Sequence, residues 1–290
     1  MKRTLAFSVL LSAFPAMAAL WPSCGGDSTR DPGSDGDTDA DGDTDADSDS
    51  DTDDGCSEAA KVVYVVDSDN SLYTFDPPTG EFGLIGTVDC GNLSSPFSMA
   101  VTRDAVAYVL FQNGDIFEVS TADATCTATP YFTGQSGFTT FGMGFATDGA
   151  DTAEETLYIA SDTSLGTIDD DWSVAFIASI SGWPELTGNG LGELWGFFPS
   201  AGTPHVSQID KANGSLVTTY PMSGLSSDAS AWAFAYWGAA FYVFYESILD
   251  TSTYVYKVDA ESGAVETYIP DSGKRIVGAG VSTCAPTTIE

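Results

Sequence analysis

The chain has 290 residues and a formal net charge of −33 at neutral pH, with 42 acidic residues against nine basic ones and a single histidine. A field of this sign repels nucleic acid and anionic lipid headgroups, so it argues against a polyanionic partner. One histidine cannot build a His-clustered zinc, copper or iron centre. The charge is therefore interpreted as a means of solubility, with binding of cations or basic partners as the alternative.

The first 23 residues have the pattern of an export signal. Lys2 and Arg3 form a basic start, and residues 4–20 form an apolar segment that is interrupted by Pro15 and is short for a membrane span. Residues 16–18 (Ala-Met-Ala) offer a cleavage site for ordinary secretion. Export predicts an oxidising environment for the mature chain.

Cys24 offers a second processing route. A small residue, Ser23, stands directly before this cysteine, as in bacterial lipoprotein precursors. The resemblance is to those precursors, although Trp21 and Pro22 depart from their usual motif. It implies a mature chain that begins with a lipidated Cys24 and is held by this lipid at the outer membrane or cell surface. Release as a secreted protein is the alternative.

Residues 24–55 form an acidic segment of low complexity. Residues 27–54 contain thirteen aspartates against the single Arg30, and residues 25–55 hold no aromatic residue and no aliphatic one larger than alanine. A segment without apolar surface to bury cannot offset the entropy lost on ordering. The composition predicts a disordered, self-repelling linker that separates the lipid from a folded domain over residues 56–290.

Part of this linker also resembles a calcium-binding loop. Asp37, Asp39, Asp41 and Asp43 stand at alternate positions, as in the Asp-rich calcium repeats of thrombospondin type 3 and dockerin modules. Ser48 occupies the position at which such a loop has its bidentate glutamate. A simple linker is the favoured interpretation, and the alternative, which the resemblance implies, is weak calcium binding by the four aspartates; no other cofactor is expected.

From residue 61 onward, the sequence has the pattern of an all-β repeat protein. Aromatic and β-branched runs alternate with turn residues, and no stretch carries a sustained helical period. Tyr254–Gly263 shows the repeating outline, which is an alternating strand closed by Asp and a turn that ends in glycine. Related segments precede it at intervals of about 40 to 50 residues, at 72–80, 115–123, 165–171 and 206–214.

A strand rich in small residues accompanies each repeat. These strands are expected at 96–101, 141–146, 186–191, 231–236 and 277–282. The last of them comes after all the aromatic-led strands and replaces the predecessor that the first repeat lacks. Small side chains fit the innermost strands of a β-propeller. The pattern predicts a five-bladed β-propeller whose C-terminal strand pairs into the first blade, with six blades as the alternative.

The folded domain contains four cysteines, enough for two disulfides. Their spacing alone allows three connectivities. Cys56 immediately precedes the first strand, and Cys284 immediately follows the closing strand that should lie beside it. The topology therefore favours Cys56–Cys284, which would fasten the ring, and by elimination Cys90–Cys126.

Propellers place ligands at the mouth of the central channel, among loops before the inner strands and loops between second and third strands. Loops 181–185 and 246–253 do not repeat and receive the most weight. The candidate ligand-binding residues are Asp67, Asp69, Asp162, Trp183, Glu185 and Glu246. All are also common in ordinary turns. The aromatic run over residues 232–245 is interpreted as packing between blades.

No catalytic residue is assigned. His205 has no accompanying nucleophile turn. A glycosidase needs two carboxylates that flank the sugar bond, and the five expected inner strands contain neither Asp nor Glu, with Glu185 just outside one of them. The sequence thus predicts a monomeric, non-catalytic binding or interaction module with a glycan or protein ligand at the channel mouth. The alternative is an extracellular hydrolase or lyase that acts on polysaccharide through Glu185, Asp67 or Asp162.

Overall fold

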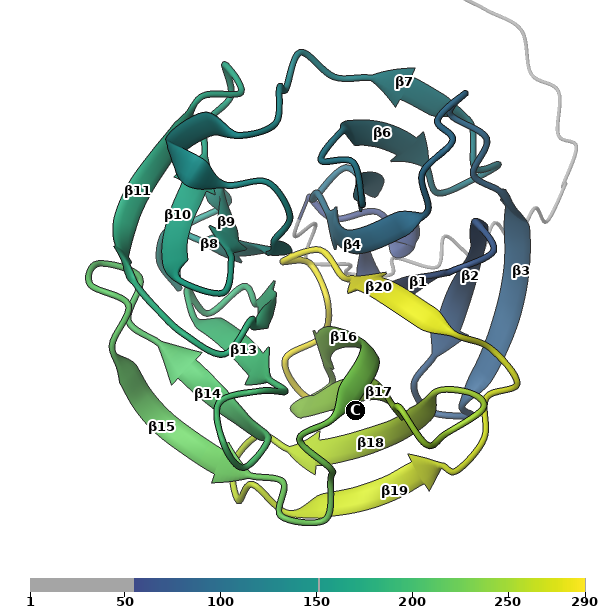
Figure 1. Ribbon diagram of the computed structural model, residues 1–290, viewed down its shortest axis with the longest axis vertical. Coiled ribbons are helices and arrows are strands. Elements are labelled where there is room, and N and C mark those ends of the chain that lie inside the picture. The colour runs from purple at the N-terminus through teal and green to yellow at the C-terminus, as the bar shows by residue number, and fades with distance from the viewer. Residues whose placement is uncertain (1–54, 151, 290) are drawn as a thin grey trace, which may run out of the picture. The chain divides into compact units, whose positions relative to one another are not determined.

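The computed structural model describes residues 55–150 and 152–289, which form five four-stranded antiparallel sheets arranged around an axis (Figure 1). The described helical segments are two short 3-10 turns, η1 (Glu58–Lys61) and η2 (Gln135–Gly137). The prediction of a five-bladed β-propeller is confirmed, and the six-bladed alternative is wrong.

The chain runs outward through each blade, from the strand nearest the axis to the strand at the rim. Blade 2 contains β4 (Pro96–Val101), β5 (Val106–Phe111), β6 (Ile116–Ser120) and β7 (Cys126–Ala128). Blade 3 contains β8 (Gly142–Thr147), β9 (Glu155–Ala160), β10 (Ser164–Ile168) and β11 (Val174–Ser179). Blade 4 contains β12 (Glu185–Gly188), β13 (Leu194–Phe198), β14 (His205–Ile209) and β15 (Leu216–Pro221). Blade 5 contains β16 (Ala229–Trp237), β17 (Ala240–Ser247), β18 (Tyr254–Asp259) and β19 (Val265–Ile269).

Blade 1 joins the two ends of the propeller. Its inner strand is the C-terminal β20 (Ile276–Gly280), which pairs antiparallel with β1 (Val63–Asp67), and β2 (Ser71–Asp76) and β3 (Glu81–Thr87) complete it. Figure 1 shows this closure where the yellow β20 lies beside the blue β1. The C-terminal strand therefore closes the ring as the sequence predicts.

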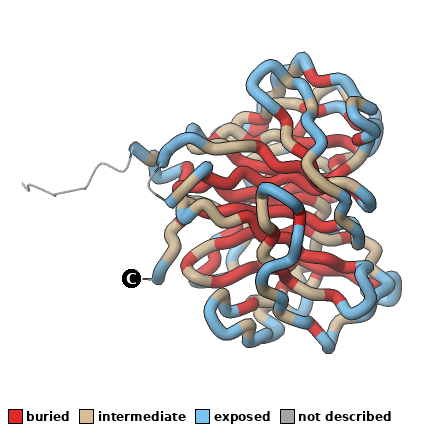
Figure 2. The backbone as a smooth tube through the Cα atoms, turned by 90° about the vertical axis from the view of Figure 1, so that its left-hand side faces the viewer, coloured by how far each residue is buried: buried red, intermediate tan, exposed pale blue. Residues whose placement is uncertain are grey.

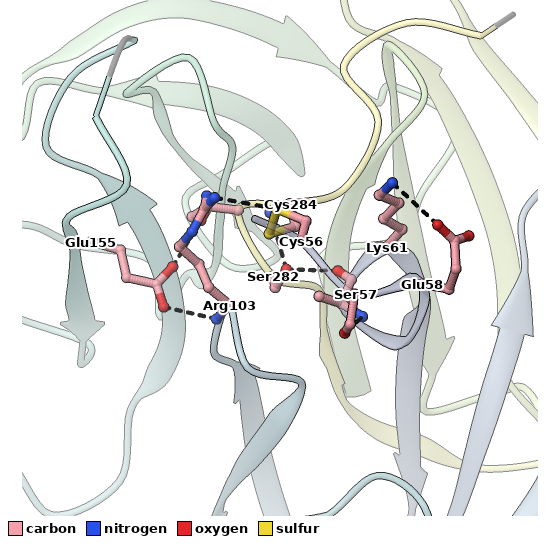
Figure 3. Close-up of a disulfide and its surroundings, with 10 residues drawn as sticks. Cys56, Ser57, Glu58, Lys61, Arg103, Glu155, Ser282 and Cys284 are labelled. Carbon is pink, nitrogen blue, oxygen red and sulfur yellow. Dashed lines mark hydrogen bonds and ion pairs between the residues drawn. A yellow bond between two sulfur atoms is a disulfide. The ribbon is translucent and has the colours of Figure 1, made fainter. Parts of the chain in front are cut away.

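A disulfide fastens the closure. Cys56 and Cys284 are bridged with their Cα atoms 5.8 Å apart, and Arg103 Nη2 donates to Cys56 Sγ at 3.2 Å (Figure 3). The hydroxyl of Ser282 donates to the Ala60 carbonyl at 2.6 Å, which ties the same two ends together a second time.

The second bridge links the connection between blades 1 and 2 to the outer strand of blade 2. It joins Cys90 to Cys126 with a Cα separation of 5.2 Å. Both predicted pairings are confirmed.

The repeated Asp and Gly residues build turns. In the stretch that displays the repeat, Asp259 Oδ1 accepts hydrogen bonds from the backbone N–H of Ser262 at 2.7 Å and from its hydroxyl at 2.6 Å. Gly263 follows at φ +70°, in the left-handed region that glycine occupies most easily, and its N–H returns to the Asp259 carbonyl. Asp210 and Gly214 repeat this geometry in blade 4. The repeat motif is thus scaffold.

The inner strands need small residues because neighbouring blades approach closely at the axis. A Cβ on Gly144 of β8 would lie 2.8 Å from the carbonyl carbon of Leu186 on β12, inside van der Waals contact. The predicted small-residue strands are confirmed, with shifted ends: β12 begins at Glu185 and ends at Gly188. The expectation that no inner strand contains an acidic residue is wrong, because Glu185 is the first residue of β12.

Aromatic side chains fill the space between blades, as predicted for the run over residues 232–245. Phe75 of blade 1 packs edge-on against Tyr242 and Phe244 of blade 5, with ring centroids 5.5 and 5.2 Å apart. Figure 2 shows the buried residues running through the strands and the exposed residues concentrated in the loops. The core is therefore a set of interfaces between sheets, which leaves the loops at both ends free to carry sites.

Candidate ligand-binding site at the channel mouth

The start of the inner strands and the loops between second and third strands surround a small cavity at one end of the channel. We call this the mouth cavity. Its volume is about 180 Å³, and four of the five blades contribute to it. The lining residues are Ser68, Ser95, Pro96, Phe97, Gln112, Glu185, Ser230, Ala231, Trp232, Arg275 and Val277.

Glu185 is the most deeply buried polar group of the mouth cavity. Its exposed fraction is 2%, and its Oε1 accepts hydrogen bonds from the Ser98 hydroxyl and from the backbone N–H of Met143. Ser98 Oγ itself accepts from the Met143 N–H at 3.1 Å. Burial raises the pKa of the Glu185 carboxyl well above its ordinary value, against the lowering by these two hydrogen bonds. The group therefore holds a proton more strongly than a glutamate in water does.

An ion pair forms another part of the mouth. Arg275, directly before β20, pairs with Glu246 at the end of β17, and its Nη2 also donates to the Ser230 carbonyl at 2.7 Å. The Ser230 hydroxyl donates to Glu246 Oε1 at 3.1 Å. The Glu246 side chain is 5% exposed and that of Arg275 is 42% exposed. The carboxylate thus lies inside the protein, while the guanidinium faces the mouth with part of its surface open to a ligand.

Trp232 and Phe97 supply the apolar surface of the mouth cavity. Both side chains are partly buried, and they come from the inner strands of blades 5 and 2. Hydroxyl, amide and guanidinium groups beside an exposed aromatic face are suited to ligands that have polar edges and an apolar face.

The predicted candidates divide into two groups. Glu185 lines the mouth cavity and Glu246 is paired with Arg275 beside it. Asp67 is 6% exposed and caps a turn, since its Oδ1 accepts from the backbone N–H groups of Asp69 and Ser71. Asp67 does not line the mouth cavity, and neither do the other three predicted residues. These are Asp69, Asp162 and Trp183, all exposed.

Of the eleven lining residues, only Glu185 is among the sequence candidates, and the two most informative omissions are Trp232 and Arg275. Trp232 belongs to the aromatic run over residues 232–245, for which the sequence predicts packing between blades, and Arg275 ends the expected mouth loop 271–275 without being a candidate itself. A signal for both exists in their position, because Arg275 directly precedes β20 and Trp232 lies in the first half of β16, on the side of the inner strands that is nearer the mouth. Arg275 is also one of only six basic residues after residue 54.

Several predictions fall elsewhere. Cys24 and the four linker aspartates at 37–43 lie outside the described residues. Within the described residues, no group of three or more His, Cys, Asp or Glu side chains could hold a metal ion. No helix in that part of the chain is long and apolar enough to cross a membrane.

Comparison with known proteins yields similarities of structure only. Neither a protein-family model nor a curated protein matches the chain. Among solved structures, a protein of unknown function from Bacteroides caccae matches 76% of this chain and 97% of its own chain, with 11% identity and a TM-score of 0.46. TolB from Acinetobacter baumannii matches 72% of this chain at 14% identity and a TM-score of 0.45, and the aligned part spans about half of the TolB chain, 52%. These likenesses identify no family.

Proposed function

We propose that the propeller is a non-catalytic binding module of an exported protein, and that its ligand inserts a single sugar ring into the mouth cavity. The observation that carries this proposal is the composition of the cavity: a partly buried Trp232 beside Gln112, Ser230 and Arg275. A volume of about 180 Å³ is below the usual range of about 300–1,000 Å³ for drug-sized ligands. It therefore suits the terminal residue of a longer molecule.

The carboxyl groups at the mouth support binding over hydrolysis. Glycoside hydrolysis requires two carboxyl groups that flank the reacting bond. Glu246 pairs with Arg275 and accepts from Ser230 through its Oε1, and Glu185 accepts from Ser98 and Met143 through its Oε1, so one oxygen of each carboxyl is already bonded within the protein. Two disulfides support export, since such bridges persist in oxidising compartments.

A second candidate function is hydrolysis of polysaccharide, and one observation favours it. The raised pKa of Glu185 would keep this carboxyl protonated into a range where it could act as a general acid. For both candidate functions, we propose that a lipid on Cys24 attaches the protein to the outer membrane or cell surface. Weak calcium binding by the linker aspartates is also part of the proposal.

A glycan array with a matched variant tests the proposal. Trp232→Ala should weaken binding by about tenfold or more, because stacking of a ligand on the indole is lost. Trp183→Ala is the control, since Trp183 is 39% exposed and lies outside the mouth cavity. Equal loss in both variants, or no glycan bound by the wild-type protein, would contradict the proposal.

Turnover separates the two candidate functions. Release of reducing ends from a bound glycan is expected for neither the wild type nor Glu185→Gln. Gln can keep the hydrogen bonds to Ser98 and Met143 while it lacks the acidic proton. Product release by the wild type that disappears in Glu185→Gln would establish the hydrolase instead.

Intact-mass measurement of the mature chain tests the anchor, because a free N-terminus at Ala19 would exclude a lipidated Cys24.

A further inference from the structure

A second and larger cavity lies between blades 2 and 3, at the end of the propeller opposite the mouth. We call it the blade 2–3 groove. It has a volume of about 520 Å³. Its lining residues are Tyr108, Glu118, Phe145, Glu155, Thr156, Leu157, Ile168, Asp169, Asp170 and Trp172. The topology places this groove at the end of the propeller away from the mouth. Glu155 begins β9 and Asp169 follows the end of β10, whereas the mouth residues lie near the starts of inner strands.

Aromatic rings from both blades form the wall of the groove. Tyr108 of β5 contacts Trp172 with ring centroids 5.2 Å apart and Phe145 of β8 with centroids 5.6 Å apart. The Tyr108 and Trp172 side chains are only partly buried, and both line the groove.

Hydrogen bonds fix the position of Trp172. Its backbone N–H donates to the Asp169 carbonyl at 2.8 Å, and its carbonyl accepts from Gln135 Nε2 at 2.9 Å. No described residue hydrogen-bonds to the Tyr108 hydroxyl or the Trp172 indole N–H, which leaves both free for a ligand.

Carboxylates stand on both sides of this aromatic wall. Glu118 lies directly across the strand pair from Tyr108, and Asp169 and Asp170 lie in the turn that also contains Trp172. Among the described residues, no basic side chain pairs with Glu118, Asp169 or Asp170. No basic residue lines the groove either.

Glu155 is the exception to this excess of charge. Glu155 Oε1 accepts from the backbone N–H of Arg103 at 3.0 Å, and its Oε2 accepts from the Thr283 hydroxyl at 2.8 Å. The positive charge of Arg103 also partly compensates the Glu155 carboxylate. Three carboxylates, spread over two blades and separated by aromatic surface, remain without a countercharge.

The geometry points to a linear aliphatic polyamine as the ligand of the blade 2–3 groove. Ammonium groups would pair with Glu118 on one side and with Asp169 and Asp170 on the other, while the chain between them crosses Tyr108 and Trp172. A single metal ion does not fit, because no three acidic groups of the described residues come close enough to hold one. A rigid or anionic ligand would leave the separated carboxylates unpaired. This site is independent of the mouth cavity and of the function proposed for it.

Titration calorimetry with spermidine at about 0.15 M salt tests the inference, since this ionic strength screens charges farther apart than about 8 Å. The wild-type protein should bind one spermidine in a saturable reaction. Asp169→Asn/Asp170→Asn and, separately, Trp172→Ala should each weaken the binding by about tenfold. The matched control is Glu81→Gln/Glu261→Gln, which removes two exposed carboxylates elsewhere and changes the net charge equally.

The controls determine how each result counts. Equal weakening in the control variant, or displacement of spermidine by equimolar Mg²⁺, would mean diffuse attraction to an acidic protein and would overturn the inference. A tetralysine peptide that binds while spermidine does not would also overturn it, in favour of a protein partner. Circular dichroism and thermal unfolding identify any variant that has not folded. For such a variant, competition by neutral 1,8-octanediol against spermidine on the wild type provides a second test, and effective competition would refute the role of the charges.

Discussion

Removing the Cys56–Cys284 bridge should destabilise the propeller more than removing Cys90–Cys126. The two bridges join residues separated by 228 and 36 positions. In the chain-entropy description, a cross-link stabilises the folded state by restricting the unfolded chain, by an amount that grows with the logarithm of the loop length. At 25 °C these separations correspond to about 5.4 and about 3.8 kcal/mol, a difference of about 1.6 kcal/mol.

Serine is the appropriate replacement at each cysteine. In Cys56→Ser/Cys284→Ser, the new hydroxyl can still accept the hydrogen bond that Arg103 donates to Cys56 Sγ. Ser282 can still donate to the Ala60 carbonyl, so the strand pairing between β20 and β1 keeps its other contacts. The comparison therefore isolates the cross-link as far as this chain allows.

Urea unfolding under non-reducing conditions measures both free energies, and hydrogen exchange locates the effect. In Cys56→Ser/Cys284→Ser, the amides paired between β1 and β20 should exchange faster than those of blade 3, because opening now starts at the ring closure. In Cys90→Ser/Cys126→Ser they should not. An equal or larger loss of stability in the second variant, or no preferential exchange at the closure in the first, would refute the reasoning.

Three further predictions concern burial and packing. Burial raises the Glu185 pKa, so the protonated group stabilises the folded state below about pH 4.5. This contribution is lost as pH rises through the pKa of the folded state. The urea midpoint should therefore fall more steeply between pH 4 and 8 for the wild type than for Glu185→Gln. Gly144→Ala should destabilise by about 1–3 kcal/mol through overlap with Leu186. In the same urea assay, Gly224→Ala, with open space around it, should change stability by less than about 1 kcal/mol in either direction. Phe75→Ala should destabilise by about 3–5 kcal/mol, whereas Phe132→Ala, 67% exposed, should change the thermal midpoint little.

The architecture was largely predictable from sequence because the propeller imposes a local demand on every repeat. Crowding at the axis requires small residues such as Gly144, and each tight turn requires residues such as Asp259 and Gly263. These demands recur along the chain and can be read without knowing any contact. The pairing of Cys56 with Cys284 then followed from the topology alone.

The site was harder to predict because it depends on where strands begin. A shift of one residue placed Glu185 inside β12 and turned a loop carboxylate into a buried one. Trp232 lies in the same alternating run as the core aromatics, and only its distance along the strand places it at the mouth. Trp183 had the stronger signal for exposure, yet it lies outside the cavity. Exposure of a loop residue therefore does not indicate whether the residue lines a cavity.

The ring closure also determines at which end the chain enters the propeller. Cys56 and Cys284 meet beside Arg103, which follows the far end of β4, whereas Ser95 and Pro96 at the near end of β4 line the mouth cavity. The polypeptide therefore enters the propeller at the end away from the mouth. The mouth loops are thus separated from the Cys56–Cys284 bridge by the length of the inner strands.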